Sequence, residues 1–162
     1  MNRLIVIAVV LVAVANDFYL HAETSPGLAH EDYFEVTLPE GFEISKQSPV
    51  EDFEMFRISR RNRLFVTIYV GNWPEFPILK PSSAVIATRF ETADCAVISL
   101  WAADGLRGRE ILLKSNRTHG WPTRLHAITA NLGPGDMRKA DQILSSIVSK
   151  LDSSRSGGES RK

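Results

Sequence analysis

Apolar and polar residues alternate along two neighbouring segments in the middle of the chain. Residues 53–60 and 63–71 carry β-branched and aromatic residues in this pattern, and Arg61 and Asn62 separate them. Alternation with a period of two is typical of β-strands, and a two-residue polar break favours an antiparallel hairpin. The second segment has apolar side chains on both faces: Leu64, Val66, Ile68 and Val70 on one, Phe65 and Tyr69 on the other. We therefore predict a central strand that is covered on both sides.

Shorter segments with the same character predict further strands. They are residues 34–38, 42–45, 85–90, 95–101, 109–113 and 124–130. Asp104 and Gly105 lie between two of them and favour a hairpin turn. Three prolines between Pro74 and Pro81 argue against a central strand there, because proline cannot donate to a strand ladder.

Near the end of the chain the apolar period changes from two residues to between three and four. This stripe consists of Met137, Ala140, Leu144, Ile147 and Leu151. Such spacing predicts one amphipathic helix that begins at Asp136 and lies on the sheet. The predicted fold class is α+β, with an antiparallel sheet of about six or seven strands and one C-terminal amphipathic helix packed on it.

The first residues have the pattern of an export signal. Arg3 supplies a positive charge, residues 4–15 are all apolar, and Ala13 and Ala15 place small residues where signal peptidase acts. We predict a signal peptide over residues 1–15, with cleavage after residue 22 as the alternative. Twelve apolar residues are too few for a membrane span of about 20 residues, so we expect no stable span after cleavage. The predicted location is the periplasm or the secreted fraction.

The remaining residues indicate one domain. We expect a loose lead-in over residues 16–32, a single α+β domain over residues 33–152, and a disordered tail of Ser, Gly and charged residues over 153–162.

The charge of the chain argues against nucleic acid as a partner. Nineteen basic and nineteen acidic residues give a formal net charge of zero. The charges are unevenly distributed, because acidic residues dominate 23–54 and basic residues dominate 57–139. Either the two regions lie against each other, or both are solvated, or the basic region is a functional patch.

Two short sequences resemble the ends of a known kind of domain. Residues 34–42 follow the pattern Phe-x-Val-x-Leu-Pro-x-Gly-Phe, and residues 140–147 read Ala-Asp-Gln-Ile-Leu-Ser-Ser-Ile. Both resemble PsbP-like domains, a group of small exported α+β proteins that includes photosystem extrinsic subunits. The resemblance covers seventeen residues and implies protein binding rather than catalysis. It assigns no catalytic residue.

Residues that could perform chemistry are few. Cys95 has no second cysteine with which to form a disulfide and is expected to be a small buried residue. His126 shares a strand face with Ile128 and Ala130, which favours a hydrogen-bonded structural histidine. A Cys95–His126 nucleophile pair is the enzymatic alternative. We expect no metal site and no cofactor, because the histidines lack metal-pair spacing and no nucleotide-binding motif is present.

The candidate binding residues lie in turns and loops. Arg60, Arg61 and Arg63 are at the hairpin tip, where guanidinium groups could contact carboxylates of a partner or merely keep the tip soluble. The aromatic candidates are Trp73, Phe76 and Trp121, which either cap the ends of the core or are exposed as interface anchors. The predicted function is a non-catalytic protein-binding module with a protein partner in the envelope: an adaptor, an accessory subunit, or an inhibitor or immunity-type protein. The alternatives are a small hydrolase that uses Cys95 or His126, and a carrier of a small apolar ligand.

Overall fold

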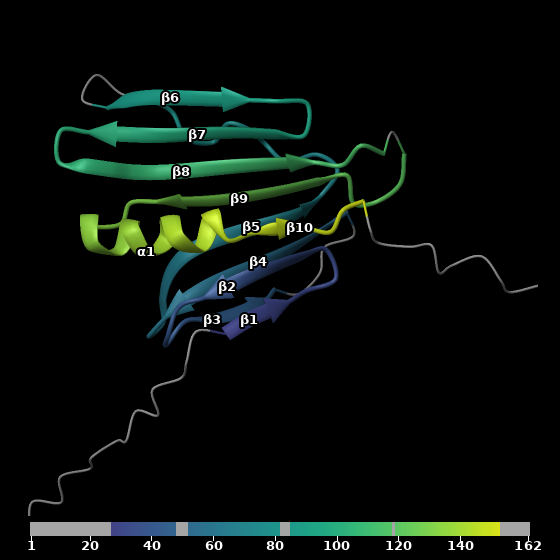
Figure 1. Cartoon of the computed structure of the whole chain (residues 1–162), viewed down its shortest axis with the longest axis horizontal. Helices are drawn as coiled ribbons and strands as arrows, with labels where there is room; N and C mark the ends of the chain where they lie inside the picture. The colour runs from purple at the N-terminus through teal and green to yellow at the C-terminus, as the bar shows by residue number, and fades with distance from the viewer. Residues whose placement is uncertain (1–26, 48–51, 82–84, 118, 153–162) are drawn as a thin grey trace, which may run out of the picture.

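Ten strands and one helix make up the described part of the chain. The computed structural model describes residues 27–47, 52–81, 85–117 and 119–152, so the predicted signal peptide and tail lie outside the described residues. The elements are β1 Gly27–His30, β2 Phe34–Leu38, β3 Glu43–Lys46, β4 Phe53–Arg60, β5 Arg63–Gly71, β6 Ile86–Glu91, β7 Cys95–Ala102, β8 Gly105–Lys114, β9 Arg124–Ala130, α1 Pro134–Ser145 and β10 Val148–Ser149. The larger sheet is antiparallel with the order β3-β4-β5-β9-β8-β7-β6 (Figure 1). The predicted α+β fold with a seven-stranded sheet and a C-terminal helix is confirmed.

The β4–β5 hairpin has the predicted boundaries. Arg61 and Asn62 form its turn with φ of 51° and 62°, the left-handed values that match the twist of a tight hairpin. Ile68 and Val66 are fully buried on one face of β5, opposite Phe56 and Ile58 of β4. β5 pairs on its other side with β9, so it is an interior strand.

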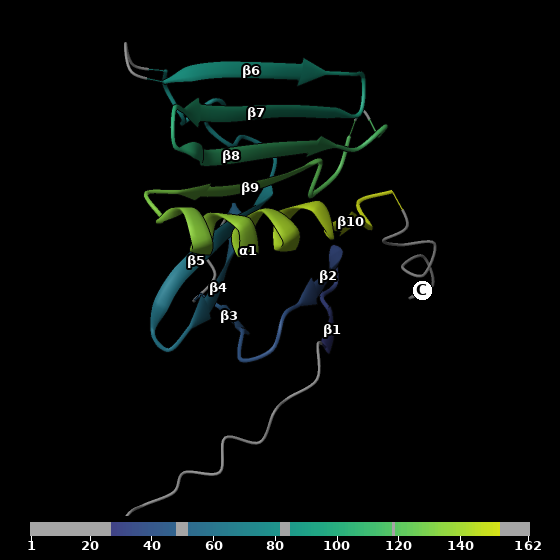
Figure 2. The same ribbon diagram turned by 60° about the vertical axis from the view of Figure 1, so that its left-hand side comes forward.

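The helix covers only part of the sheet. α1 packs on β5, β8 and β9 and leaves β6 and β7 beyond its edge (Figure 2). Met137, Ala140, Ile143 and Leu144 fill the space between helix and sheet, each 1% exposed or less. Buried apolar side chains therefore hold the helix to the sheet.

The helix is shorter than the apolar stripe predicted. It ends at Ser145. The backbone N–H of the next residue, Ser146, donates to the carbonyl oxygen of Ile143, and the Ser146 hydroxyl donates to the carbonyl oxygen of Thr37 in β2. Ile147 and Leu151 still pack toward the core, but from the chain that follows the helix. The apolar spacing extends past the end of the helix because Ile147 and Leu151 also pack on the core, although their backbone is not helical.

A second small sheet was not predicted. β1 and β10 pair with the two edges of β2 in the order β1-β2-β10. Part of the predicted loose lead-in is therefore a strand, since residues 27–30 pair with β2. Ser149 lies opposite Phe34, so the strand that follows the helix pairs with β2, near the first of the described residues.

The face of the sheet opposite α1 is crossed by the segment that follows β5. In this segment Leu79 packs against Ile98 and Leu100 of β7. Adding a Cβ to Gly108 of β8 would place it 3.1 Å from Leu79 Cδ1, so a glycine permits this close approach. Among the described residues, no helix is long and apolar enough to cross a membrane.

Candidate functional site

Two of the three hairpin-tip arginines have partners within the chain. The guanidinium of Arg60 lies 5.7 Å from the ring centre of Phe42. Arg63 forms a 2.6 Å ion pair with Asp136 in the first turn of α1. Arg61 is exposed at the turn. The tip therefore helps to hold the helix N-terminus, which the sequence pattern did not indicate.

The three aromatic candidates have different environments. Trp73 is 88% exposed, as an interface anchor would be. Phe76 is half-buried and meets the ring of His126 edge-on, with 5.7 Å between ring centres. Trp121 donates its indole N–H to the carbonyl oxygen of Asp52 at 3.0 Å and stays 41% exposed. Phe76 and Trp121 thus have packing partners within the chain, and Trp73 is by far the most exposed of the three.

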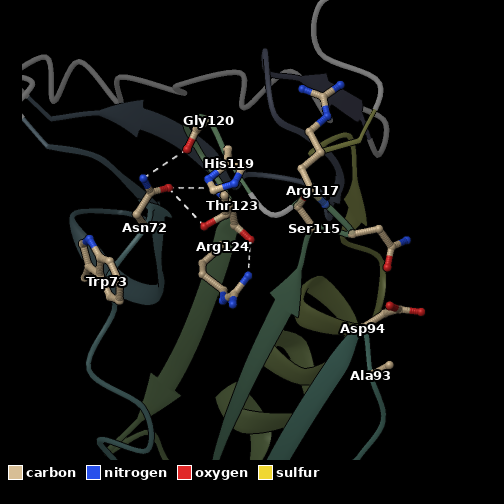
Figure 3. Close-up of a pocket in the computed structure, with 11 residues that line it drawn as sticks. Asn72, Trp73, Ala93, Asp94, Ser115, Arg117, His119, Gly120, Thr123 and Arg124 are labelled. Carbon is tan, nitrogen blue, oxygen red and sulfur yellow. Dashed lines mark hydrogen bonds between the residues drawn. The ribbon is translucent and has the colours of Figure 1, made fainter.

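Trp73 stands at the mouth of a cleft of about 640 Å³ at one end of the larger sheet (Figure 3). Three connections meet there: the start of the β5–β6 segment, the β6–β7 turn and the β8–β9 loop. The residues that line the cleft are Asn72, Trp73, Ala93, Asp94, Ser115, Asn116, Arg117, His119, Gly120, Thr123 and Arg124. The three connections are far apart in sequence, so no local pattern predicted this cleft.

Asn72 holds two walls of the cleft together. Its amide nitrogen donates to the carbonyl of Gly120 at 3.2 Å. Its carbonyl oxygen accepts from the backbone N–H of Thr123 at 2.9 Å and from the hydroxyl of the same residue at 3.1 Å. These bonds fix the β8–β9 loop against Asn72. The backbone next to Trp73 is therefore held in place.

The start of the β8–β9 loop is fixed by Asp152, the last described residue. The carboxylate of Asp152 accepts from the hydroxyl of Ser115 and from the backbone N–H of Asn116 at 3.1 Å. Arg117 donates to the backbone carbonyl of Asp152 at 2.7 Å.

The third wall, the β6–β7 turn, is tied to β8. The backbone N–H of Lys114 donates to the carbonyl oxygen of Asp94 at 2.8 Å. The walls are therefore set before any ligand arrives, which lowers the entropy cost of binding.

Arg124 supplies positive charge within the cleft. Figure 3 places its side chain between Trp73 and Asp94. One guanidinium nitrogen donates to the carbonyl of Thr123 at 2.9 Å. A guanidinium has five N–H groups, so Arg124 retains donors for a carboxylate or other planar anion. An exposed indole beside a guanidinium is a combination that recurs at interface hot spots.

A buried contact between a carboxylate and an imidazole lies on the sheet face opposite the helix. Glu110 of β8 is fully buried, and its Oε1 is 2.7 Å from Nε2 of His126 on β9, although the angle is outside that of a regular hydrogen bond. The carboxylate also accepts the backbone N–H groups of Ile78 at 2.8 Å and Leu79 at 2.9 Å. Burial raises the pKa of Glu110, but His126 and the two amides outweigh burial and hold that pKa below its usual value.

This pair anchors the β5–β6 segment and has no access to the cleft. The prediction of a structural role for His126 agrees with its burial to 3% exposure. Glu110 was not singled out in the sequence. An acidic residue between Gly108 and Leu112, on a strand face that points inward, could have indicated a buried carboxylate. Its partners could not be predicted, because they depend on how the β5–β6 segment crosses the sheet.

The two halves of the alternative nucleophile pair are on opposite faces of the sheet. Cys95 lies opposite Leu113 of β8, whereas His126 lies opposite Leu112, the neighbouring residue that faces the other way. β8 also separates their strands. Burial raises the pKa of the Cys95 thiol, which disfavours the reactive thiolate. This geometry gives Cys95 no base in His126.

The described residues thus place their accessible chemistry at the cleft, where ring, guanidinium and amide groups face solvent. Within those residues, no group of three or more His, Cys, Asp or Glu side chains could hold a metal ion. A scan of the chain against models of known protein families gives no match, and a comparison with curated protein sequences gives none either.

Proposed function

We propose that this chain is a non-catalytic binding protein of the periplasm or the secreted fraction, and that a protein partner docks at the cleft beside Trp73. The observation that carries the proposal is the 88% exposure of this indole at the mouth of a 640 Å³ cleft with fixed walls. Leaving a large aromatic ring in water is unfavourable, and such residues anchor protein interfaces.

The charge of the cleft indicates which part of the partner enters it. Arg124 and Arg117 contribute two positive charges, and Asp94 contributes one negative charge. An acidic side chain or a terminal carboxylate therefore suits the interior, while an apolar group of the partner packs on Trp73. The export signal predicted at residues 1–15 and the resemblance to PsbP-like domains support an accessory role in the envelope.

The test is affinity capture from the native envelope with the parent chain and three variants. Trp73→Ala should lower the affinity of the captured partner about 30-fold or more, because hot-spot tryptophans contribute about 2 kcal/mol or more. Arg124→Gln should weaken binding and make it less sensitive to salt. Leu28→Ala is the control, because Leu28 is also an exposed apolar residue, at 54%, but lies on β1 outside the cleft lining.

The hairpin tip is tested in the same experiment. Replacing Arg60, Arg61 and Arg63 with Ser removes the other candidate surface. If this triple variant loses the partner and Trp73→Ala retains it, the binding site is the tip and the proposal is wrong.

A further inference from the structure

β6, an edge strand of the seven-stranded sheet, is exposed along its whole length. All six residues of β6 are exposed, and β7 is its neighbour on one side only. α1 packs on β5, β8 and β9, so the helix-side face of β6 and β7 has no cover from it (Figure 2). A strand with an open edge can pair with another strand.

Large apolar side chains gather on this uncovered face. Ile86 is 73% exposed, Phe90 is 63% exposed and Trp101 is 42% exposed. The register places Ile86 directly opposite Trp101, and Thr88 lies between Ile86 and Phe90 on the same side of β6. The Trp101 indole N–H donates to the Thr88 hydroxyl at 3.3 Å, which holds the indole against β6. The face and the edge therefore form one surface, the β6 surface, made of Ile86, Thr88, Phe90 and Trp101 with the outer backbone of β6.

The hydrogen-bond phase of β6 identifies which backbone groups point outward. The N–H of Thr92 donates to the carbonyl of Cys95 at 2.7 Å, so these two residues form a hydrogen-bonded pair. Such pairs alternate along an antiparallel ladder. The N–H and C=O groups of Ala87, Arg89 and Glu91 therefore point away from β7, toward the open edge.

We propose that a second copy of this chain pairs with β6, antiparallel, about a two-fold axis at Thr88. In this register Ile86 of each copy lies opposite Phe90 of the other, and the two Thr88 residues lie opposite each other. Aromatic–β-branched and Thr–Thr pairs are favourable across strands. The outward groups of Ala87 and Arg89 meet each other and supply the backbone hydrogen bonds.

Charge selects this register over its neighbour. Moving the axis to Arg89 would also align the outward groups, but it would place two arginines directly opposite each other, which is destabilising. With the axis at Thr88, Arg89 faces Ala87 of the second copy and keeps its 2.6 Å ion pair with Glu91 of its own chain. The strand is thus complementary to itself, as a two-fold interface requires.

The area available sets the strength of the dimer. Pairing at the edge covers the outer flanks of Ile86 and Phe90 and the outward backbone groups of β6, while Trp101 lies one strand further in, on β7. The total therefore falls below the about 1,200 Å² at which specific interfaces begin. The dimer is therefore a weak one, with a Kd of about 1–100 µM rather than nanomolar.

Sedimentation velocity of the purified full chain between about 1 and 200 µM tests the association, a range that spans the Kd expected for so small an interface. The parent chain should pass from monomer to dimer in this range. Thr88→Lys, which sets two lysines against each other on the axis, should raise the Kd at least tenfold. Ser45→Lys is the matched control, because Ser45 is exposed on β3, the opposite edge of the same sheet. Association by any other part of the chain would persist in both variants.

Cysteine cross-linking tests the register. Residue 88 of the two copies would form a non-hydrogen-bonded pair with Cα atoms about 4.5 Å apart, within the range of a disulfide. Thr88→Cys in a Cys95→Ser background should therefore give a covalent dimer on mild oxidation, and Arg89→Cys should give at least fivefold less. A monomer at 200 µM, equal association of Thr88→Lys and the parent, or preferential cross-linking through residue 89 would each overturn the proposal. Binding of a different protein by a chain that stays monomeric would overturn it as well.

Discussion

Glu110→Ala is the substitution whose consequences the structure defines best. The carboxylate is fully buried and accepts the backbone N–H groups of Ile78 and Leu79. Its removal leaves the two amides without their acceptor and His126 without its carboxylate neighbour. Each buried unsatisfied group costs about 1–3 kcal/mol. If the segment stays in place, the two amides alone should therefore lower the free energy of unfolding by about 2–6 kcal/mol.

Detachment of the segment from the sheet has a lower free-energy cost. The detached amides bind water, and the loss is the burial of Leu79, which contributes about 1.5–3 kcal/mol. The smaller cost decides, so we expect local detachment of the β5–β6 segment with a global loss nearer 2–3 kcal/mol. Both responses deprive the amides of Ile78 and Leu79 of their acceptor, and detachment also exposes these amides to solvent.

Urea unfolding and hydrogen exchange measure the two effects together. In Glu110→Ala the amides of Ile78 and Leu79 should exchange at least tenfold faster, while those of β5 stay protected. Glu75→Ala is the matched control, because Glu75 is an exposed carboxylate in the same segment. Unchanged exchange at both amides, with an unfolding free energy within about 0.5 kcal/mol of the parent, would refute the anchoring role of Glu110.

Four further outcomes follow from the packing and the lowered or raised pKa values. Ile68→Ala and Leu144→Ala, both fully buried, should each lower the free energy of unfolding by about 2–5 kcal/mol in urea titrations, and a loss below 0.5 kcal/mol would contradict their core positions. Gly108→Ala should cost about 1–3 kcal/mol, because its Cβ would press on Leu79 and on a backbone carbonyl; a neutral effect would mean that the segment yields freely. Cys95 should react with a thiol reagent at pH 8 more slowly than a free cysteine, because burial raises its pKa, and an equal rate would show an accessible thiolate. The pKa of Glu110 is lowered in the fold, so its stabilisation is complete above about pH 4.5 and is lost as the pH falls; the stability advantage of the parent over Glu110→Gln should shrink below that pH, and a constant difference would contradict the assignment.

The parts of the fold that sequence predicted are those encoded by local alternation. β2 and β9 have the predicted boundaries, and the β4–β5 hairpin does too. Alternating or continuous apolar residues mark each of these strands, and a left-handed turn joins the pair. β10 has only two residues and β1 has four, which is too few for a period to be recognised. Both exist because β2 offers them two free edges.

The features that sequence missed depend on distant segments meeting. The anchoring of Ile78 and Leu79 needs a carboxylate from β8, 31 residues further along the chain. The cleft joins Asn72 to Gly120 across 48 residues. Residue type alone singled out Trp73, but its exposure could not be distinguished from core capping until the surrounding loops were placed.

Site-specific photo-cross-linking at position 73 tests the binding function most directly. A photoreactive aromatic amino acid, which keeps a ring at this position, replaces Trp73 in the chain produced in its native cells. The same amino acid replaces Glu40 on the exposed β2–β3 turn as the control. The cleft proposal predicts one discrete heavier product from position 73, absent from position 40 and containing the partner recovered by affinity capture. No product from position 73, or the same products from both positions, would contradict it.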